Sequence, residues 1–246
     1  MNKTAVIGGT GLETMAGLEI LDRMECDTPY GKPSAGLIRG NFAGREIIFL
    51  PRHGKDSVYP PHAVNYQANI WALKHQGVRT VIGVNAVGGI TEEMRPRLLV
   101  LPDQIIDYTW GRQQTFFNGG STPLTHVEFT TPYNEMLRKQ IISAAGIAQV
   151  HLHDGGTYGA TQGPRLETAA EIIRMERDGC DVVGMTGMPE CALARELGLD
   201  YASICLVVNR AAGKSEELIT MELIRENIEF AVKDLTLVFN ELFLII

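Results

Sequence analysis

The sequence lacks the features that identify several classes of protein. Its four cysteines, Cys26, Cys180, Cys191 and Cys205, stand far apart and form no Cys-x-x-Cys pair. They therefore indicate neither a zinc site nor the disulfide framework of a small secreted domain, and we expect them to be reduced and mostly buried. No run of about 18 apolar residues predicts a transmembrane helix. The N-terminal MNKTAVIGG contains no secretory signal, so the expected location is the cytoplasm, with no membrane partner.

Basic residues are too few and too dispersed to predict a nucleic-acid partner. The 246 residues contain 22 Lys and Arg against 29 Asp and Glu, which gives a formal net charge of −7. No segment gathers its basic residues into a run of five or six. Hydrophobic residues make up 45% of the chain and charged residues 21%. This balance is typical of a globular protein and excludes a disordered or collagen-like chain.

Short β-branched segments alternate with helical patterns along the chain. Several of the segments are apolar at consecutive positions, as in strands that are covered on both faces. We expect strands at 4–9, 46–54, 80–89, 98–106, 181–185 and 201–209, and helices at 64–77, 134–146, 165–179, 189–198 and from about 216 onward. This order predicts a single α/β domain over residues 1–246, with a mostly parallel or mixed twisted sheet and helices on both faces. The apolar C-terminal FNELFLII is expected to pack onto the body of the protein or onto a neighbouring subunit.

Three short motifs suggest a ligand but have the wrong spacing. The GTG at 9–11 follows a strand, but Thr14 stands where a dinucleotide fingerprint needs its third glycine. The GKS at 213–215 looks like the end of a P-loop, yet the leading glycine would fall at Val208, inside a strand. The HLHD at 151–154 has no third ligand nearby, so we predict no metal site.

Four strand ends carry groups that can bind an anion. They are GGTGL at 8–12, Arg52-His53, NAVGG at 85–89 and Met185-Thr186-Gly187. Open parallel sheets bind ligands beyond the carboxyl ends of their strands. Backbone amides, hydroxyls and a guanidinium fork can together hold phosphate without a P-loop lysine. Each segment taken singly is explained as a turn or a solvated loop, and only their joint occurrence predicts a phosphate site.

Seven ordered motifs make the chain similar to the purine nucleoside phosphorylase family. They are GGTGL, PRHG, PPHAVNYQANIWALK, NAVGGI, GPRLETAAE, VVGMTGMPE and YASICLVVN. The resemblance covers nearly the whole chain. It is closest to the methylthioadenosine phosphorylase branch, which also resembles the TFF…HV stretch at 115–127. It implies a homotrimeric α/β enzyme in which inorganic phosphate attacks the anomeric carbon of a purine nucleoside, releasing the base and a pentose 1-phosphate. Phosphate is then a co-substrate, and no cofactor is expected.

The same resemblance assigns the phosphate site. It implies that phosphate is held by Thr10, Arg52, His53, Asn85, Ala86 and Thr186, and that Met185 lies against the ribose. His53 is expected either as a plain phosphate ligand or as an acid or base, because the sequence does not fix its protonation state.

The base site departs from the adenine-using branch, which has an Asp-x-Asp where this chain has Asn209, Arg210 and Ala211. That branch also has a serine in place of Glu167, and a glutamate with an asparagine resembles the 6-oxopurine phosphorylases. An ionised Glu167 can accept from the N–H at ring position 1. Asn209 can donate to the 6-oxo group and accept from a proton-bearing ring nitrogen 7 as the base departs. We expect Glu167, Asn209, Arg210 and Ala211 to contact the substrate. Taken alone, Glu167 is explained as a helix N-terminal carboxylate and Asn209 as a turn former.

The 5′ end of the sugar gives a further expectation. The 6-oxopurine phosphorylases resemble one another in a histidine that follows the base-binding asparagine, whereas residues 210–230 contain none. An apolar pocket suits a 5′-methylthio group, because a buried hydroxyl without a partner costs about 1–3 kcal/mol. We expect Met221 to contact the substrate and His126 to complete the pocket of a neighbouring subunit. The candidates for this apolar pocket are Leu218, Ile219, Met221, Leu223 and Ile224. The same residues are equally well explained as the core face of the last helix.

These expectations combine into a leading hypothesis. The substrate is 5′-methylthioinosine, which phosphate splits to hypoxanthine and 5-methylthioribose 1-phosphate in purine and methylthioadenosine salvage, with Asn209, Glu167 and His53 as catalytic residues. The alternatives are a general inosine and guanosine phosphorylase, a methylthioadenosine enzyme with an atypical base site, and a nucleoside-binding module that has lost its chemistry.

Overall fold

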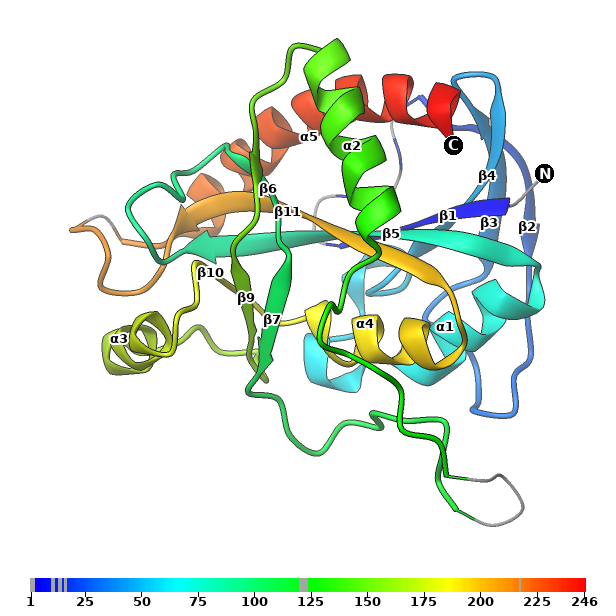
Figure 1. Ribbon diagram of the computed structural model, residues 1–246, viewed down its shortest axis with the longest axis horizontal. Helices are drawn as coiled ribbons and strands as arrows, with labels where there is room; N and C mark the ends of the chain where they lie inside the picture. Colours follow the sequence, from blue (N-terminus) through cyan, green and yellow to red (C-terminus); the bar gives the residue numbers. More distant parts are fainter. Residues whose placement is uncertain (1–2, 10–11, 13–14, 16, 120–123, 217) are drawn as a thin grey trace.

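A computed structural model describes residues 3–246 except 10–11, 13–14, 16, 120–123 and 217 (Figure 1). Its described residues form one mixed sheet and five α-helices. The strands are β1 (Lys3–Gly8), β2 (Glu19–Met24), β3 (Leu37–Phe42), β4 (Arg45–Pro51), β5 (Val78–Gly89), β6 (Leu99–Leu101), β7 (Gln104–Asp107), β8 (Leu152–Asp154), β9 (Thr157–Ala160), β10 (Val182–Gly184) and β11 (Asp200–Arg210). The α-helices are α1 (Tyr66–His75), α2 (Glu135–Ile147), α3 (Ala169–Arg177), α4 (Gly187–Glu196) and α5 (Met221–Ile245).

The sheet is parallel at its centre and mixed at its edges. Its main path runs β2-β3-β4-β1-β5-β10-β9-β7, while β11 pairs with β5 and β6, and β6 pairs with β8. Strands β4, β1, β5 and β11 are parallel, so their carboxyl ends point the same way. Residues that follow β1, β4 and β11 are therefore brought to one side of the sheet.

The central strand β5 is left without a strand partner along part of one edge. Its other edge pairs with β11 from Thr80 to Gly89. On the edge in question, β1 pairs as far as Gly83 and β10 pairs only at Gly88 and Gly89. Among the described strands, nothing pairs with residues 84–87 there. Buried backbone groups need partners, so this interruption is where side chains and a ligand can approach the sheet.

Helices cover both faces of the sheet (Figure 1). Helices α1 and α4 pack on one face through a cluster that includes Ile70, Leu73 and Leu193. Helices α2 and α5 pack on the other face, where Ile141 and Phe239 are among the buried residues. Four of the five helices begin at a residue whose side chain accepts a backbone N–H of the first turn. These N-caps are Asn65 for α1, Asn134 for α2, Thr168 for α3 and Thr220 for α5.

The α/β class and the helices on both faces are confirmed, with differences in detail. The strand expected at 98–106 is interrupted at Pro102, which has no N–H for a ladder, and its two halves join different neighbours: β6 pairs with β11, and β7 with β9. The helix expected from 165 begins at Ala169, because Thr168 and Glu171 form a capping box. Helix α4 begins at Gly187, ahead of Pro189. The HLHD segment, which the sequence places on a strand, forms β8, whereas β2, β3 and β9 were not predicted.

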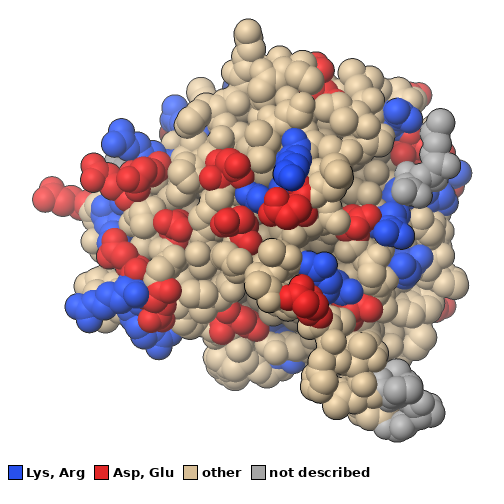
Figure 2. All heavy atoms as spheres, viewed as in Figure 1, with Lys and Arg blue, Asp and Glu red and all other residues tan. Residues whose placement is uncertain are grey.

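The C-terminal helix packs onto the chain's own body, as one of the two expected arrangements. Phe42 of β3 contacts the rings of Phe239 and Phe243 edge-on, with centroids 6.4 and 5.4 Å away. The four cysteines are free, and all but Cys26 are buried. No helix in the described ranges is both long and apolar enough to cross a bilayer. Acidic and basic side chains are interspersed over the face shown in Figure 2, without a continuous basic patch among the residues drawn there in colour.

Candidate active site

A cavity of about 250 Å³ opens beside the unpaired stretch of β5. It lies where β1, β4, β10 and β11 end, so short segments from distant parts of the sequence meet there. Its polar lining includes Arg52, His53, Glu167, Thr186 and Asn209. The remaining lining residues are Gly9, Pro61, Ala86, Val87, Gly88, Pro164, Leu166, Val183, Gly184, Met185, Val208, Ala211, Ala212, Ile219, Met221 and Ile224.

Arg52, which lines the cavity, forms a buried ion pair with Glu190. Arg52 Nε and Nη2 donate to the two oxygens of Glu190 at 2.6 and 2.8 Å, and the side chains are 0% and 1% exposed. Arg52 Nη1 donates to the carbonyl of Val84 at 2.8 Å, which satisfies the unpaired edge of β5. Three of the five guanidinium N–H groups are thereby used, so at most two remain for a ligand.

Electrostatics keep Arg52 charged. Burial alone would lower the pKa of Arg52, but the Glu190 carboxylate outweighs burial and holds that pKa above its ordinary value. Tyr201 donates its hydroxyl to Glu190 Oε1 at 2.8 Å. Burial and the Glu190 charge raise the pKa of Tyr201 well above its usual range, so its hydroxyl stays protonated as a donor. The cation is thus fixed in place within a low-dielectric surrounding.

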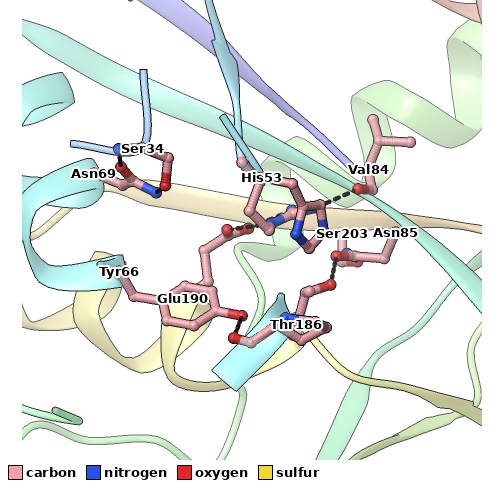
Figure 3. A network of polar contacts seen from close by, with 12 residues as sticks. Ser34, His53, Tyr66, Asn69, Val84, Asn85, Thr186, Glu190 and Ser203 are labelled. Atoms are coloured by element: carbon pink, nitrogen blue, oxygen red, sulfur yellow. Dashed lines mark hydrogen bonds and ion pairs between the residues drawn. The ribbon is translucent and has the colours of Figure 1, made fainter. Parts of the chain in front are cut away.

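A second polar chain fixes Thr186 at the start of α4. Its hydroxyl donates to Asn85 Oδ1 at 2.7 Å, and Asn85 Nδ2 donates to the Ser203 hydroxyl at 2.6 Å (Figure 3). The backbone N–H groups of Thr186 and Gly187 both donate to the Tyr158 hydroxyl at 3.3 Å. Burial raises the pKa of Tyr158 to about 12. The side chain and the backbone of Thr186 are therefore both fixed by hydrogen bonds to buried residues, and Thr186 lines the cavity.

His53 follows β4 and is buried at the cavity wall. Its Nδ1 lies 2.8 Å from the carbonyl of Tyr59. A carbonyl only accepts, so Nδ1 carries a proton. In the neutral ring, Nε2 is then an acceptor, and it becomes a donor only when the imidazole is protonated.

Glu167 and Asn209 also line the cavity. Glu167 is half-buried, and its Oε1 accepts the hydroxyl of Thr161 at 2.6 Å. Asn209 is buried at the end of β11, where the register with β5 shifts, and its Nδ2 donates to the carbonyl of Arg210 at 2.7 Å. A Cβ at Gly88 would lie 3.3 Å from Asn209 Nδ2, so the absence of a side chain leaves this wall flat. The carboxylate and the carboxamide thus face a shared space.

Most residues that the sequence nominated meet at this cavity. Three lie elsewhere, and Thr10 lies outside the described residues. Asn85 is fully buried behind Thr186 and is not among the lining residues. Arg210 points away, because its guanidinium donates to the carbonyls of Ile90, Thr91 and Met94. His126 is exposed in an irregular segment. The nominated residues that line the cavity are Arg52, His53, Ala86, Glu167, Met185, Thr186, Asn209, Ala211 and Met221.

Glu190 is the main functional residue that sequence reasoning missed. It stands in the otherwise apolar stretch GMPECALA, and a lone acid among buried residues requires a cationic partner. That signal indicates a buried pair but does not say which arginine provides it. Among the described residues, no group of three His, Cys, Asp or Glu side chains is placed to hold a metal ion.

Comparison with known proteins gives consistent results. A family model described as the phosphorylase superfamily matches residues 3–243. A probable S-methyl-5′-thioinosine phosphorylase from Pseudomonas syringae pv. tomato is 53% identical over 95% of this chain and 94% of its own length. A probable 6-oxopurine nucleoside phosphorylase from Thermococcus kodakarensis is 43% identical over 89% of this chain and 84% of its own. Methylthioadenosine phosphorylase from Schistosoma mansoni, solved in complex with adenine, superposes with a TM-score of 0.93 at 33% identity, covering 100% of this chain and 92% of that one.

We predict that Glu190→Gln lowers the free energy of unfolding by about 3–5 kcal/mol, because it leaves the buried charge of Arg52 without a counter-charge. The double variant Arg52→Met with Glu190→Leu should recover only part of this loss, since it removes both buried charges but leaves the Val84 carbonyl and the Tyr201 hydroxyl without their partners. Urea unfolding measures both. Glu226→Gln, which breaks the exposed pair with Arg97, serves as the control and should change stability far less. Equal losses for Glu190→Gln and Glu226→Gln would contradict the assignment.

Proposed function

The chain belongs to the phosphorylase superfamily, and on that basis we propose that it cleaves a 6-oxopurine nucleoside with inorganic phosphate, 5′-methylthioinosine being the preferred substrate. The observation that carries the proposal is that Glu167 and Asn209 share one cavity with Arg52, His53 and Thr186. A carboxylate and a carboxamide can read a purine there, beside a cation that can bind phosphate and the Thr186 hydroxyl, which can donate to phosphate when its proton turns away from Asn85 Oδ1.

The purine preference follows from hydrogen-bond complementarity. A 6-oxopurine carries a donor at ring nitrogen 1 and an acceptor at carbon 6. Glu167 has one oxygen engaged by Thr161 and can accept the ring N–H with the other. Asn209 can use its amide to donate to the 6-oxo group, and its carbonyl can accept from ring nitrogen 7 when that nitrogen carries a proton as the base departs. Adenine would present a lone pair to the carboxylate, and such mismatches reject a substrate by about 10⁴-fold.

The reaction needs positioning and electrostatic stabilisation. A phosphate oxygen forms a bond to C1′ while the bond from C1′ to purine nitrogen 9 breaks, and its electron pair leaves with the base. The phosphate anion, held by Arg52, His53 and Thr186, stabilises the positive charge that develops on the ribose. Asn209 stabilises the negative charge on the departing purine by donating its amide to the 6-oxo group, and Glu167 orients the base through the N–H at ring position 1. Thr10 and Ala86 belong to the same proposed phosphate site, and Asn85 serves it by holding Thr186.

The phosphate contacts constrain the proton on His53. Because Nδ1 is committed to the carbonyl of Tyr59, a neutral His53 meets phosphate through an acceptor at Nε2. It therefore either accepts a hydroxyl of a protonated phosphate or binds the dianion as an imidazolium. In both cases His53 acts on phosphate rather than on the base.

The methylthio preference rests on the apolar lining at the start of α5. Ile219, Met221 and Ile224 line the cavity, whereas Leu218 is 82% exposed. Within the described part of residues 210–230, the side chains at this wall offer no histidine to a 5′-hydroxyl. Met185 is proposed to lie against the ribose, between this wall and Thr186.

We also propose that the protein is a cytoplasmic homotrimer in which His126 approaches the site of a neighbouring subunit. Free cysteines are typical of a reducing compartment. His126 lies in an irregular segment that also exposes Trp110 and Leu124, which are 71% and 72% accessible, and large exposed apolar side chains favour association.

We predict that the combined Glu167→Ser and Asn209→Asp variant shifts preference toward 6-aminopurines. The ratio of kcat/KM for 5′-methylthioinosine over methylthioadenosine should fall at least 100-fold, because the keto-reading pair is replaced. Release of base from inosine, adenosine and both methylthio analogues measures this. The control is Glu229→Ser with Asn240→Asp, the same exchanges at exposed positions of α5. An unchanged ratio, or a wild type that prefers methylthioadenosine, would refute the base assignment.

The 5′ pocket is tested at Met221. In Met221→Gln, an amide replaces the thioether and can partner a 5′-hydroxyl, so the ratio of kcat/KM for 5′-methylthioinosine over inosine should fall about 10-fold or more. Leu218→Gln makes a comparable change at an exposed neighbour that does not line the cavity and should leave the ratio as it is. Equal effects in the two variants would mean that Met221 does not contact the 5′ group.

The oligomer has its own test. Sedimentation equilibrium should give about three times the 27.0 kDa of one chain. His126→Ala should raise the KM for the nucleoside while the mass stays the same. A monomer with full activity would rule out the shared site.

A further inference from the structure

Arg112, in the irregular segment after β7, makes an unusual set of contacts. Its Nη1 donates to the carbonyls of Met185 and Met188 at 2.9 and 2.5 Å. Its Nη2 donates to the carbonyls of Thr161 and Gln162 at 3.1 and 2.9 Å. Its Nε donates to the side-chain oxygen of Gln162 at 3.2 Å. Within the described part of the chain, no carboxylate pairs with it.

The four backbone carbonyls have a physical reason to need this partner. Met188 is extended (φ −116°, ψ 142°) inside α4, so its carbonyl does not follow the hydrogen-bond pattern of the helix. Met185 lies between β10 and α4, and Thr161 and Gln162 lie just beyond β9. These positions supply no ladder or helix partner, and carbonyls left unpaired inside a protein are costly. A planar guanidinium offers five N–H donors in a fixed fork, whereas an ammonium offers three on one atom.

These carbonyls belong to the two halves of the candidate site. Met185 and Met188 flank Thr186, the phosphate-side hydroxyl. Thr161 donates its hydroxyl to Glu167 and its N–H to the carbonyl of Gly184, at 2.6 and 2.8 Å. The guanidinium also lies over the Tyr66 ring, 5.5 Å from its centroid. It therefore joins the turn that carries Thr186 to the segment that orients Glu167, without lining the cavity itself.

We propose that Arg112 is a positioning residue that sets the distance between the phosphate turn and the base-reading carboxylate. The proposal rests on the proposed function for its catalytic consequence. By fixing both segments to one rigid fork, Arg112 holds phosphate and purine at the separation that in-line attack on C1′ requires. Arg112 also lies in the same connection between β7 and α2 as His126, so it ties the described part of that connection after β7 to the site.

The test compares Arg112→Met and Arg112→Lys with the wild type and with Arg177→Met, an exposed arginine on α3. Arg112→Met should lower kcat/KM at least 10-fold, raise the KM for phosphate and reduce selectivity for 6-oxopurines over 6-aminopurines. Arg112→Lys should recover little, because lysine keeps the charge but loses the fork. Hydrogen exchange should accelerate in peptides that cover 159–165 and 184–190. Arg177→Met should change none of these quantities.

Full recovery by Arg112→Lys would show that charge alone matters and would overturn the proposal, as would unchanged exchange in both peptides of Arg112→Met. Should Arg112→Met not fold, Arg112→Gln, which retains one donor group, carries the same measurements. A wild type that releases no base from any nucleoside would defeat the proposed function. Faster exchange in the two peptides would still support the mechanical role of Arg112.

Discussion

The site depends on an interruption in the central strand. β5 pairs with β11 along one edge from Thr80 to Gly89, but on the other edge β1 stops at Gly83 and β10 begins only at Gly88, so none of the described strands pairs with residues 84–87 there. A buried carbonyl there requires a donor. Arg52 supplies it at Val84, and Glu190 balances the charge that Arg52 introduces. The sheet thus accommodates a cation at its centre, and the cavity forms beside it.

Most polar groups around this cavity are held by other protein groups. Thr186 is held by Asn85, its turn by Tyr158, and Glu167 by Thr161. Preorganisation of this kind lowers the reorganisation that a charged transition state demands. It also requires glycine where backbone and side chain approach closely: a Cβ at Gly184 would overlap the Tyr158 hydroxyl, and one at Gly88 would press on Asn209. The glycine-rich motifs are therefore part of the geometry of the site and not only turns.

The sequence predicted the strands and helices that build the centre of the fold, because they are strongly patterned. The apolar runs of β1, β5 and β11 and the helices with clear N-caps lie within a few residues of their expected positions. Strands β2 and β3 were missed because β2 is largely exposed and the apolar pattern of β3 is interrupted by Arg39, Gly40 and Asn41. At the site, most of the residues expected from the sequence line the cavity, but Glu190 was missed although it lies in the motif VVGMTGMPE. Arg112 was missed because its partners are backbone carbonyls, which leave no trace in the sequence.

What the sequence determined by itself was the inventory: an α/β pattern, a set of anion-binding strand ends, and a glutamate and an asparagine in place of a serine and an aspartate. Only the tertiary structure decided which of these groups meet. It placed Arg52 on Glu190, although 138 positions separate them, moved Asn85 behind Thr186, and turned Arg210 away toward the carbonyls of residues 90–94. The reason is that a residue's type fixes which bonds it can make, while long-range strand pairing and the demand that buried polar groups be satisfied fix which bonds it does make.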